Sequence, residues 1–150
     1  MTSEKIVQNF ILTDQDGKDF ELYKNLNKNI LLVFYPKDDS RVCSKQLKNY
    51  YENENLFTEK NIKIVGINTD SIESHQKFCS KLGIKIPLLN DRDKEVSKYF
   101  NALNIFGINK RKIVLINRDK QIIFEKDIPY TSYPDSVELV NNFDSLKDSR

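Results

Sequence analysis

The feature that most constrains the fold is an alternation of strand, helix and strand in the first half of the chain. Residues 30–35 form an unbroken apolar run of β-favouring side chains, which is typical of a buried strand, and residues 62–67 form a second one. Between them, residues 42–59 carry apolar side chains at helical spacing: Cys43, Leu47, Tyr50 and Tyr51. This order predicts a parallel βαβ unit with a right-handed crossover.

The segments on either side of this unit predict further elements. Residues 10–12 and 20–22 flank an Asp-Gly turn, which indicates an N-terminal β-hairpin. A helix is expected between a cap at Asp70 and a stop near Gly83. We expect its inward face to carry five residues: Ile72, His75, Phe78, Cys79 and Leu82.

The second half of the chain predicts shorter elements and a final helix. We expect a strand at 87–89, a helix at 94–100, a hairpin of strands at 113–116 and 121–124, and a helix at 134–146 with Val137, Val140 and Phe143 facing inward. The predicted fold is a single α/β domain over residues 1–150, thioredoxin-like, with a central mixed sheet flanked by helices.

Composition excludes several classes of protein. The chain has 150 residues, of which 39% are hydrophobic and 31% charged, as in a globular domain. The net charge of +2 is weak and its lysines and arginines are spread among acids, so no nucleic-acid partner is expected. Neither a signal peptide nor a membrane-spanning run is present, so we expect no membrane partner and a cytoplasmic location, with a removed targeting segment left open.

Cys43 is the strongest candidate nucleophile. It follows a strand and a loop and falls in the first turn of a predicted helix, where unpaired backbone N–H groups and the helix dipole favour a thiolate. Asp38 and Asp39 precede that helix and are interpreted as caps or dipole partners. His75 is the sole histidine, so no multi-histidine metal site is expected, and we interpret it as a partly exposed helix residue. No cofactor is expected.

A set of motifs points to a known family. The segment Pro36…Ser40…Cys43 matches the pattern P-x-x-x-[T/S]-x-x-C, and matching text flanks it at 34–39, 65–70, 74–78 and 87–91, in the same order. On these residues, from about Phe10 to Phe124, the chain resembles the peroxiredoxins of the AhpC/TSA superfamily, in the bacterioferritin-comigratory-protein or PrxQ branch.

The resemblance implies a role for each matching residue. Cys43 would be the peroxidatic nucleophile, which attacks a hydroperoxide and becomes a sulfenic acid. The Ser40 hydroxyl and the backbone N–H groups of Val42 and Cys43 would face the departing oxygen, and Pro36 would shield the sulfur. The family's arginine before a late strand aligns with Arg111, with Lys110 and Lys112 as neighbouring alternatives, and would hold both thiolate and peroxide.

The position of the second cysteine, Cys79, indicates which subclass of the branch the chain resembles. Many members of this branch have a resolving cysteine five residues after the first, but Lys48 occupies that position, whereas other members place it in the helix that carries Cys79 here. The resemblance therefore implies an intramolecular disulfide that thioredoxin reduces, although a structural thiol stays open. Because the Cα atoms of a disulfide lie within about 7 Å, we expect both cysteine-bearing helix segments to unwind in each cycle.

The leading expectation is a monomeric antioxidant enzyme, a thioredoxin-dependent peroxidase that reduces hydrogen peroxide and small organic hydroperoxides. Two alternatives are a one-cysteine peroxidase resolved by an external thiol and a non-catalytic redox sensor or relay. The chain departs from the branch at Ser40, commonly threonine, at Arg41-Val42, where Pro-Gly is usual, and at Ile113-Val114, which replaces Thr-Phe. These departures bear on substrate preference and rate more than on reaction type.

Overall fold

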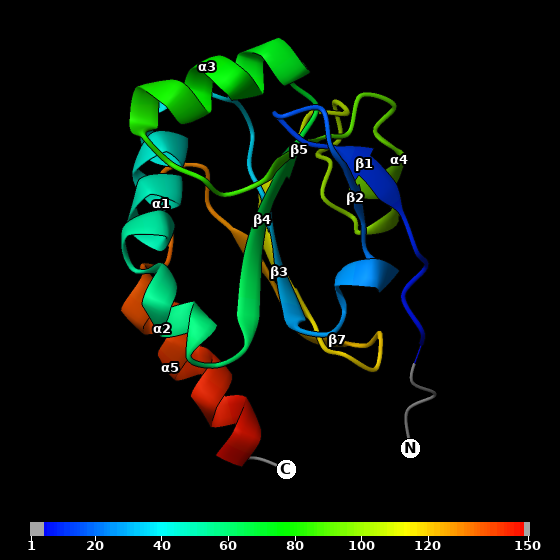
Figure 1. Ribbon diagram of the computed structural model, residues 1–150, viewed down its shortest axis with the longest axis vertical. Helices are drawn as coiled ribbons and strands as arrows, with labels where there is room; N and C mark the ends of the chain where they lie inside the picture. The colour runs from blue at the N-terminus through cyan, green and yellow to red at the C-terminus, as the bar shows by residue number, and fades with distance from the viewer. Residues whose placement is uncertain (1–4, 149–150) are drawn as a thin grey trace.

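The computed structural model describes residues 5–148 and has a seven-stranded mixed sheet at its centre, in the order β2-β1-β5-β4-β3-β6-β7. Figure 1 shows this sheet with helices packed around it. The strands are β1 (Ile11–Thr13), β2 (Asp19–Glu21), β3 (Asn29–Phe34), β4 (Ile62–Asn68), β5 (Leu88–Asn90), β6 (Arg111–Ile116) and β7 (Ile122–Ile128). The helices are the 3-10 turn η1 (Tyr23–Asn25), α1 (Arg41–Glu52), α2 (Glu54–Thr58), α3 (Ile72–Leu82), α4 (Glu95–Tyr99) and α5 (Ser136–Asp148).

Strand β3 lies inside the sheet, between β4 and β6. It pairs in parallel with β4 on one side and antiparallel with β6 on the other, so the predicted βαβ unit is confirmed. Its side chains alternate between two apolar cores, with Leu31, Val33 and Tyr35 in one and Ile30, Leu32 and Phe34 in the other. Because both faces of β3 are covered, its sequence is a continuous apolar run.

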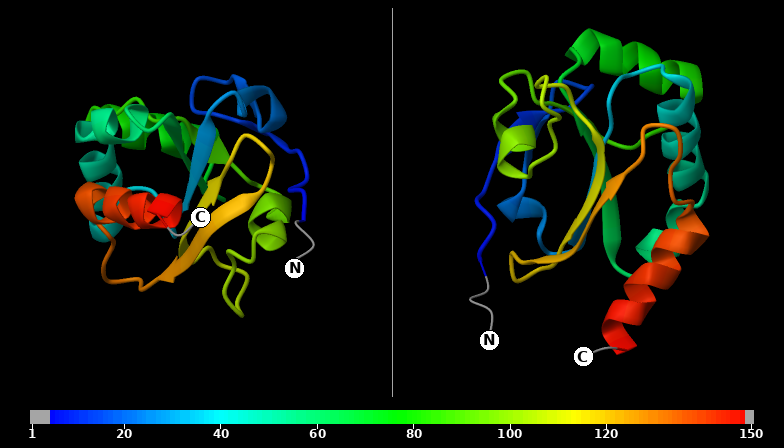
Figure 2. Two further views of the ribbon diagram at one scale, coloured as in Figure 1. Left: turned by 90° about the horizontal axis from the view of Figure 1, so that it is seen from below. Right: turned by 180° about the vertical axis from the view of Figure 1, so that it is seen from behind.

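The two cores lie on opposite faces of the sheet. Helices α1, α2, α3 and α5 cover one face, and the β1–β2 hairpin, η1 and α4 cover the other (Figure 2). Both candidate thiols, Cys43 and Cys79, belong to the core under α1, α3 and α5. Within the described part of the chain, no helix is both long and apolar enough to cross a membrane.

Three details of the predicted elements are wrong. The helix expected at 42–59 is broken at Asn53, whose side-chain amide donates to the Asn49 carbonyl at 2.9 Å and competes with helix continuation. The cap of α3 is Ser71 rather than Asp70, because the Ser71 hydroxyl accepts from the Ser74 N–H at 3.1 Å.

The third difference concerns α5. Val137 is 58% exposed, whereas the helix buries Leu139, Val140 and Phe143. Once Leu139 lies at the centre of the inward stripe, Val137, two residues earlier and about 200° around the helix, turns to solvent. The expected left-handed stop of α3 at Gly83 is confirmed, with φ of 68°.

Candidate active site

Cys43 lies in the first turn of α1, as the sequence predicts. Its side chain is fully buried and its thiol is free. Ser40 caps the helix, and its hydroxyl oxygen accepts from the Cys43 N–H at 3.4 Å. A hydroxyl that accepts one hydrogen bond still has its own hydrogen to donate, so Ser40 keeps a donor for a bound substrate.

Arg111 reaches the same sulfur from the strand next to β3. It begins β6, whose register beside β3 brings it next to the loop that follows β3. Its Nη2 lies 3.4 Å from the Cys43 Sγ, and only 1% of the residue is exposed. The neighbouring cations point elsewhere: Lys110 pairs with Asp127, and Lys112 donates to the Phe100 carbonyl oxygen.

Gln46 holds the guanidinium in place, a contact that the sequence analysis missed. Its Oε1 accepts from Arg111 Nη1 at 2.6 Å, and Tyr130 O accepts from Nη2 at 3.3 Å. No carboxylate among the side chains of residues 5–146 forms an ion pair with Arg111, and its Nε has no hydrogen-bond partner there. The sulfur of Cys43 therefore faces an uncompensated positive charge. The sequence held one signal for this contact: Gln46 is a polar residue on the buried stripe of α1, one turn after Cys43.

Pro36 lies half-buried at the start of the loop between β3 and α1. It follows the last residues of β3, on the same connection as Ser40 and Cys43. Its shielding of the sulfur stays a prediction.

Asp38 and His75 form a buried network that the sequence analysis did not predict. His75 is fully buried rather than partly exposed, and its Nδ1 lies 2.6 Å from Asp38 Oδ2. Asp38 also accepts from the hydroxyls of Tyr35 at 2.6 Å and Ser74 at 2.7 Å and from the Asn68 amide at 3.2 Å. The residue thus ties three elements together instead of capping α1.

These partners control the charge of Asp38. Burial by itself raises the pKa of this carboxyl, but hydrogen bonds and positive charge from His75, with bonds from Tyr35 and Ser74, bring the pKa below its ordinary value of 3.8. The carboxylate is therefore ionised in the folded protein at neutral pH. The position of His75 one turn before Cys79, on the stripe expected to face inward, was the signal for its burial.

Cys79 occupies a different environment one turn further along α3. Burial raises the pKa of its thiol to about 12, and the negative charges of Asp38, Asp16 and Asp14 add to the shift. Cys79 is 8% exposed and free, and it lines a cavity of about 520 Å³. None of the residues predicted around Cys43 lines that cavity, whose other walls are Gln15, Asp16, Gln76, Ser80, Gly83, Ile84 and Lys85.

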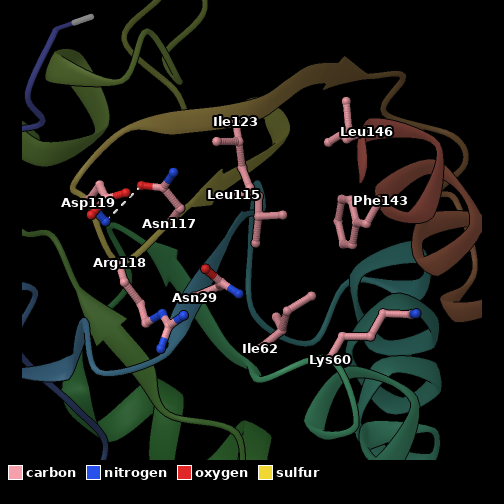
Figure 3. Close-up of a pocket in the computed structure, with 10 residues that line it drawn as sticks. All are labelled: Asn29, Lys60, Ile62, Leu115, Asn117, Arg118, Asp119, Ile123, Phe143 and Leu146. Atoms are coloured by element: carbon pink, nitrogen blue, oxygen red, sulfur yellow. Dashed lines mark hydrogen bonds between the residues drawn. The ribbon is translucent and has the colours of Figure 1, made fainter. Parts of the chain in front are cut away.

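A second cavity, of about 460 Å³, lies at the other end of β3. Figure 3 shows Phe143 and Leu146 of α5 on one wall, opposite Leu115 and Ile123 of the β6–β7 hairpin. None of the residues of the Cys43 site lines it. Among the described residues, no group of three or more histidine, cysteine, aspartate or glutamate side chains could hold a metal ion.

The chain is similar to known proteins in sequence and in fold. The model of the AhpC/TSA family matches residues 4–125. The chain is 35% identical over 98 residues to the "Putative peroxiredoxin bcp" of Helicobacter pylori, a match that covers 65% of this chain and spans 64% of the relative's length. It is 30% identical over 132 residues to the chloroplastic peroxiredoxin Q of Sedum lineare, covering 81% of this chain and 71% of that protein.

The fold has a close counterpart among solved structures. The peroxidoxin BcpB of Mycobacterium tuberculosis superposes with a TM-score of 0.82 over 100% of this chain and 99% of that one, at 24% identity. The predicted thioredoxin-like fold is thereby confirmed. Since a family model matches most of the chain and its relatives include bcp and peroxiredoxin Q proteins, the chain belongs to the AhpC/TSA family, in agreement with the resemblance found in its sequence.

Proposed function

We propose that the protein is a thiol peroxidase that reduces hydrogen peroxide and small organic hydroperoxides at Cys43. The observation that carries the proposal is the approach of Arg111 Nη2 to within 3.4 Å of the Cys43 Sγ, at the start of a helix and out of contact with solvent. A guanidinium without a carboxylate partner stabilises negative charge on the sulfur and, during reaction, on the atoms that attach to it.

The arrangement suits nucleophilic attack on an O–O bond. The Cys43 thiolate bonds to one peroxide oxygen while the O–O bond breaks, giving a sulfenic acid and an alkoxide or hydroxide that takes up a proton. Negative charge moves from sulfur to the departing oxygen, so a donor set fixed before the reaction lowers the barrier. Gln46 and the Tyr130 carbonyl fix the Arg111 fork, and the Ser40 hydroxyl supplies a further donor.

Cys79 completes the proposed cycle. It attacks the sulfenic acid of Cys43, and thioredoxin reduces the resulting disulfide. The chain contains two cysteines, and both lie in the same apolar core, which supports the pairing. We further propose that the protein acts as a monomer in the cytoplasm, the location that its bacterial bcp relatives would favour.

One observation favours a second candidate, a one-cysteine peroxidase that an external thiol resolves. The pKa of Cys79 is raised to about 12 and its thiol lines a cavity separate from the Cys43 site, so it is a weak nucleophile where it stands. Under this reading Cys79 is a structural core residue. The sensor alternative differs from both because it predicts no turnover with thioredoxin and thioredoxin reductase or with another thiol such as glutathione.

The intact mass of the protein after oxidation separates these functions. One equivalent of hydrogen peroxide is added to the reduced protein without reductant. Loss of two hydrogens, absent in Cys79→Ser, supports the two-cysteine cycle, whereas a persistent gain of one oxygen supports the one-cysteine enzyme. An unchanged mass would contradict peroxidase function altogether. Turnover with thioredoxin and its reductase, or with glutathione, then distinguishes an enzyme from a sensor.

A further inference from the structure

The loop before Cys43 is attached to the helix that carries Cys79 at two points, one on each side of Cys79. The buried attachment joins Asp38 to Ser74 and His75 near the start of α3. The other joins Asp39 to Lys81 near the end of α3, at 2.8 Å, with side chains 58% and 66% exposed. Exposed ion pairs contribute little because water and salt screen them, so the buried attachment dominates.

The buried attachment is a short contact between a histidine and a carboxylate. His75 Nδ1 faces Asp38 Oδ2 at 2.6 Å, and His75 Nε2 faces the Leu89 carbonyl oxygen at 3.2 Å. Both side chains are buried, and Asp38 is ionised, so the contact is a hydrogen bond to a charged acceptor. Separating the two is costly because each would lose a partner away from water.

Resolution of the sulfenic acid requires this region to move. The Cys79 sulfur attacks the Cys43 sulfur, an S–S bond forms, the S–O bond breaks, and the departing hydroxide takes the Cys79 proton and leaves as water. The two sulfurs must come to about 2 Å, yet both thiols are free and buried, and Cys79 lines a cavity to which no residue of the Cys43 site contributes. Cys79 therefore has to leave its place in α3.

We propose that the buried Asp38–His75 pair is a latch that holds α3 against the loop before Cys43 and sets the rate at which Cys79 reaches the oxidised thiol. This proposal rests on the thiol peroxidase function proposed above, in its two-cysteine form. His75 acts as a positioning residue for disulfide formation and takes no part in the attack on peroxide. Weakening the latch raises the population of the open segment and so speeds the resolving step.

The test follows the two steps separately. Reduced protein is mixed rapidly with hydrogen peroxide, quenched at successive times and weighed intact, so that the oxygen adduct and the disulfide are counted in the same samples. In His75→Gln the new amide takes the place of Nε2 and loses Asp38, and we expect disulfide formation to become about tenfold faster relative to oxygen addition. In His75→Asn the amide takes the place of Nδ1 and keeps a neutral bond to Asp38, so the rate should fall between those of His75→Gln and the natural protein.

Two further variants serve as controls. Ser74→Ala removes one hydrogen bond from the Asp38 carboxylate and leaves the histidine in place, so we expect a smaller acceleration of disulfide formation. We expect this variant to fold even if the His75 variants do not. Lys81→Met breaks the exposed attachment between the same loop and helix, and its rates should match those of the natural protein.

The outcomes separate the latch from the function on which it rests. Normal oxidation of Cys43 with an unchanged or slower disulfide step in His75→Gln and Ser74→Ala would overturn the latch alone. An equal acceleration of disulfide formation in Lys81→Met would also overturn the latch, because the exposed contact would then hold α3 as firmly as the buried pair. A persistent oxygen adduct in the natural protein would remove the resolving step and the latch together, and an absence of any oxidation would overturn the proposed function itself.

Discussion

Cys43 and Cys79 share a helical setting, an apolar core and almost complete burial, yet their electrostatic surroundings are opposite. Cys43 has a guanidinium 3.4 Å from its sulfur. Cys79 has carboxylates around it, and burial together with their charge raises the pKa of its thiol to about 12. Burial alone therefore does not decide whether a thiol reacts; the charge buried with it does. On the proposed mechanism, the first thiol reacts in the folded protein, whereas the second has to leave its place.

The largest difference between Cys43 and Cys79 is expected when each is replaced by serine and peroxide reduction is measured. Cys43→Ser should abolish peroxide reduction, because no other nucleophilic side chain among the described residues bonds to Arg111. Cys79→Ser should still consume one equivalent of peroxide per protein. A coupled assay and a single-turnover peroxide assay measure the two effects. Retained turnover in Cys43→Ser would disprove the assignment of the nucleophile.

Removing the charge beside Cys43 should have the next largest effect. Arg111→Ala is expected to slow peroxide attack by about 3 to 5 kcal/mol at the transition state, at saturating reductant. Lys110→Ala is the matched control, since it removes a neighbouring cation whose partner is the exposed Asp127. Stopped-flow measurement of peroxide consumption checks both. Equal rates for the two variants would mean that the arginine plays no part in the attack.

The unreactive state of Cys79 can be measured directly. A rise in the pKa of its thiol from 9.0 to about 12 lowers the thiolate fraction at neutral pH, and the greater nucleophilicity of a more basic thiolate offsets part of that loss. In Cys43→Ser we expect iodoacetamide to alkylate folded Cys79 roughly thirty- to sixtyfold more slowly than the urea-unfolded chain, before any steric hindrance is added. Similar rates in the two states would contradict the shift.

Orientation of the guanidinium should matter less than its presence. Gln46→Met keeps the size of the side chain but removes the acceptor of the 2.6 Å bond from Arg111 Nη1. We expect peroxide attack to slow by about tenfold, near 1.4 kcal/mol, because the fork loses one of its fixed contacts. Gln76→Met serves as a control, since Gln76 bonds the Gln15 carbonyl away from Cys43. An effect as large as that of Arg111→Ala would show that Gln46 acts on the substrate itself.

Local signals in the sequence were sufficient to predict the main helices and strands of this molecule. The buried strand at 30–35, the helix start at Cys43 and the glycine stop at Gly83 each follow from a few neighbouring residues, and the structure agrees with them. Arg111 came from the resemblance, since nothing in its own segment separates it from Lys110 and Lys112. The sheet separates them, because adjacent residues of a strand point to opposite faces.

The buried polar contacts could not be predicted in the same way. Asp38 meets His75 across 37 residues, and Gln46 meets Arg111 across 65. Periodicity reports which face of an element is buried but not which distant polar group will lie opposite it. Asp38 was therefore interpreted as a cap or dipole partner and His75 as partly exposed. Only the tertiary fold supplies the partners that make their burial tolerable.

The distance along the chain between Cys43 and Arg111, 68 residues, has a consequence during synthesis. The nucleophile leaves the ribosome long before its cation, and strand β6 must be made and added beside β3 before the two can meet. A nascent or partly folded chain thus carries an ordinary cysteine, with the modest reactivity of a free thiol. On the proposed function, sensitivity to peroxide is acquired only when β6 docks beside β3, so the finished protein reacts with the oxidant and its precursors are spared.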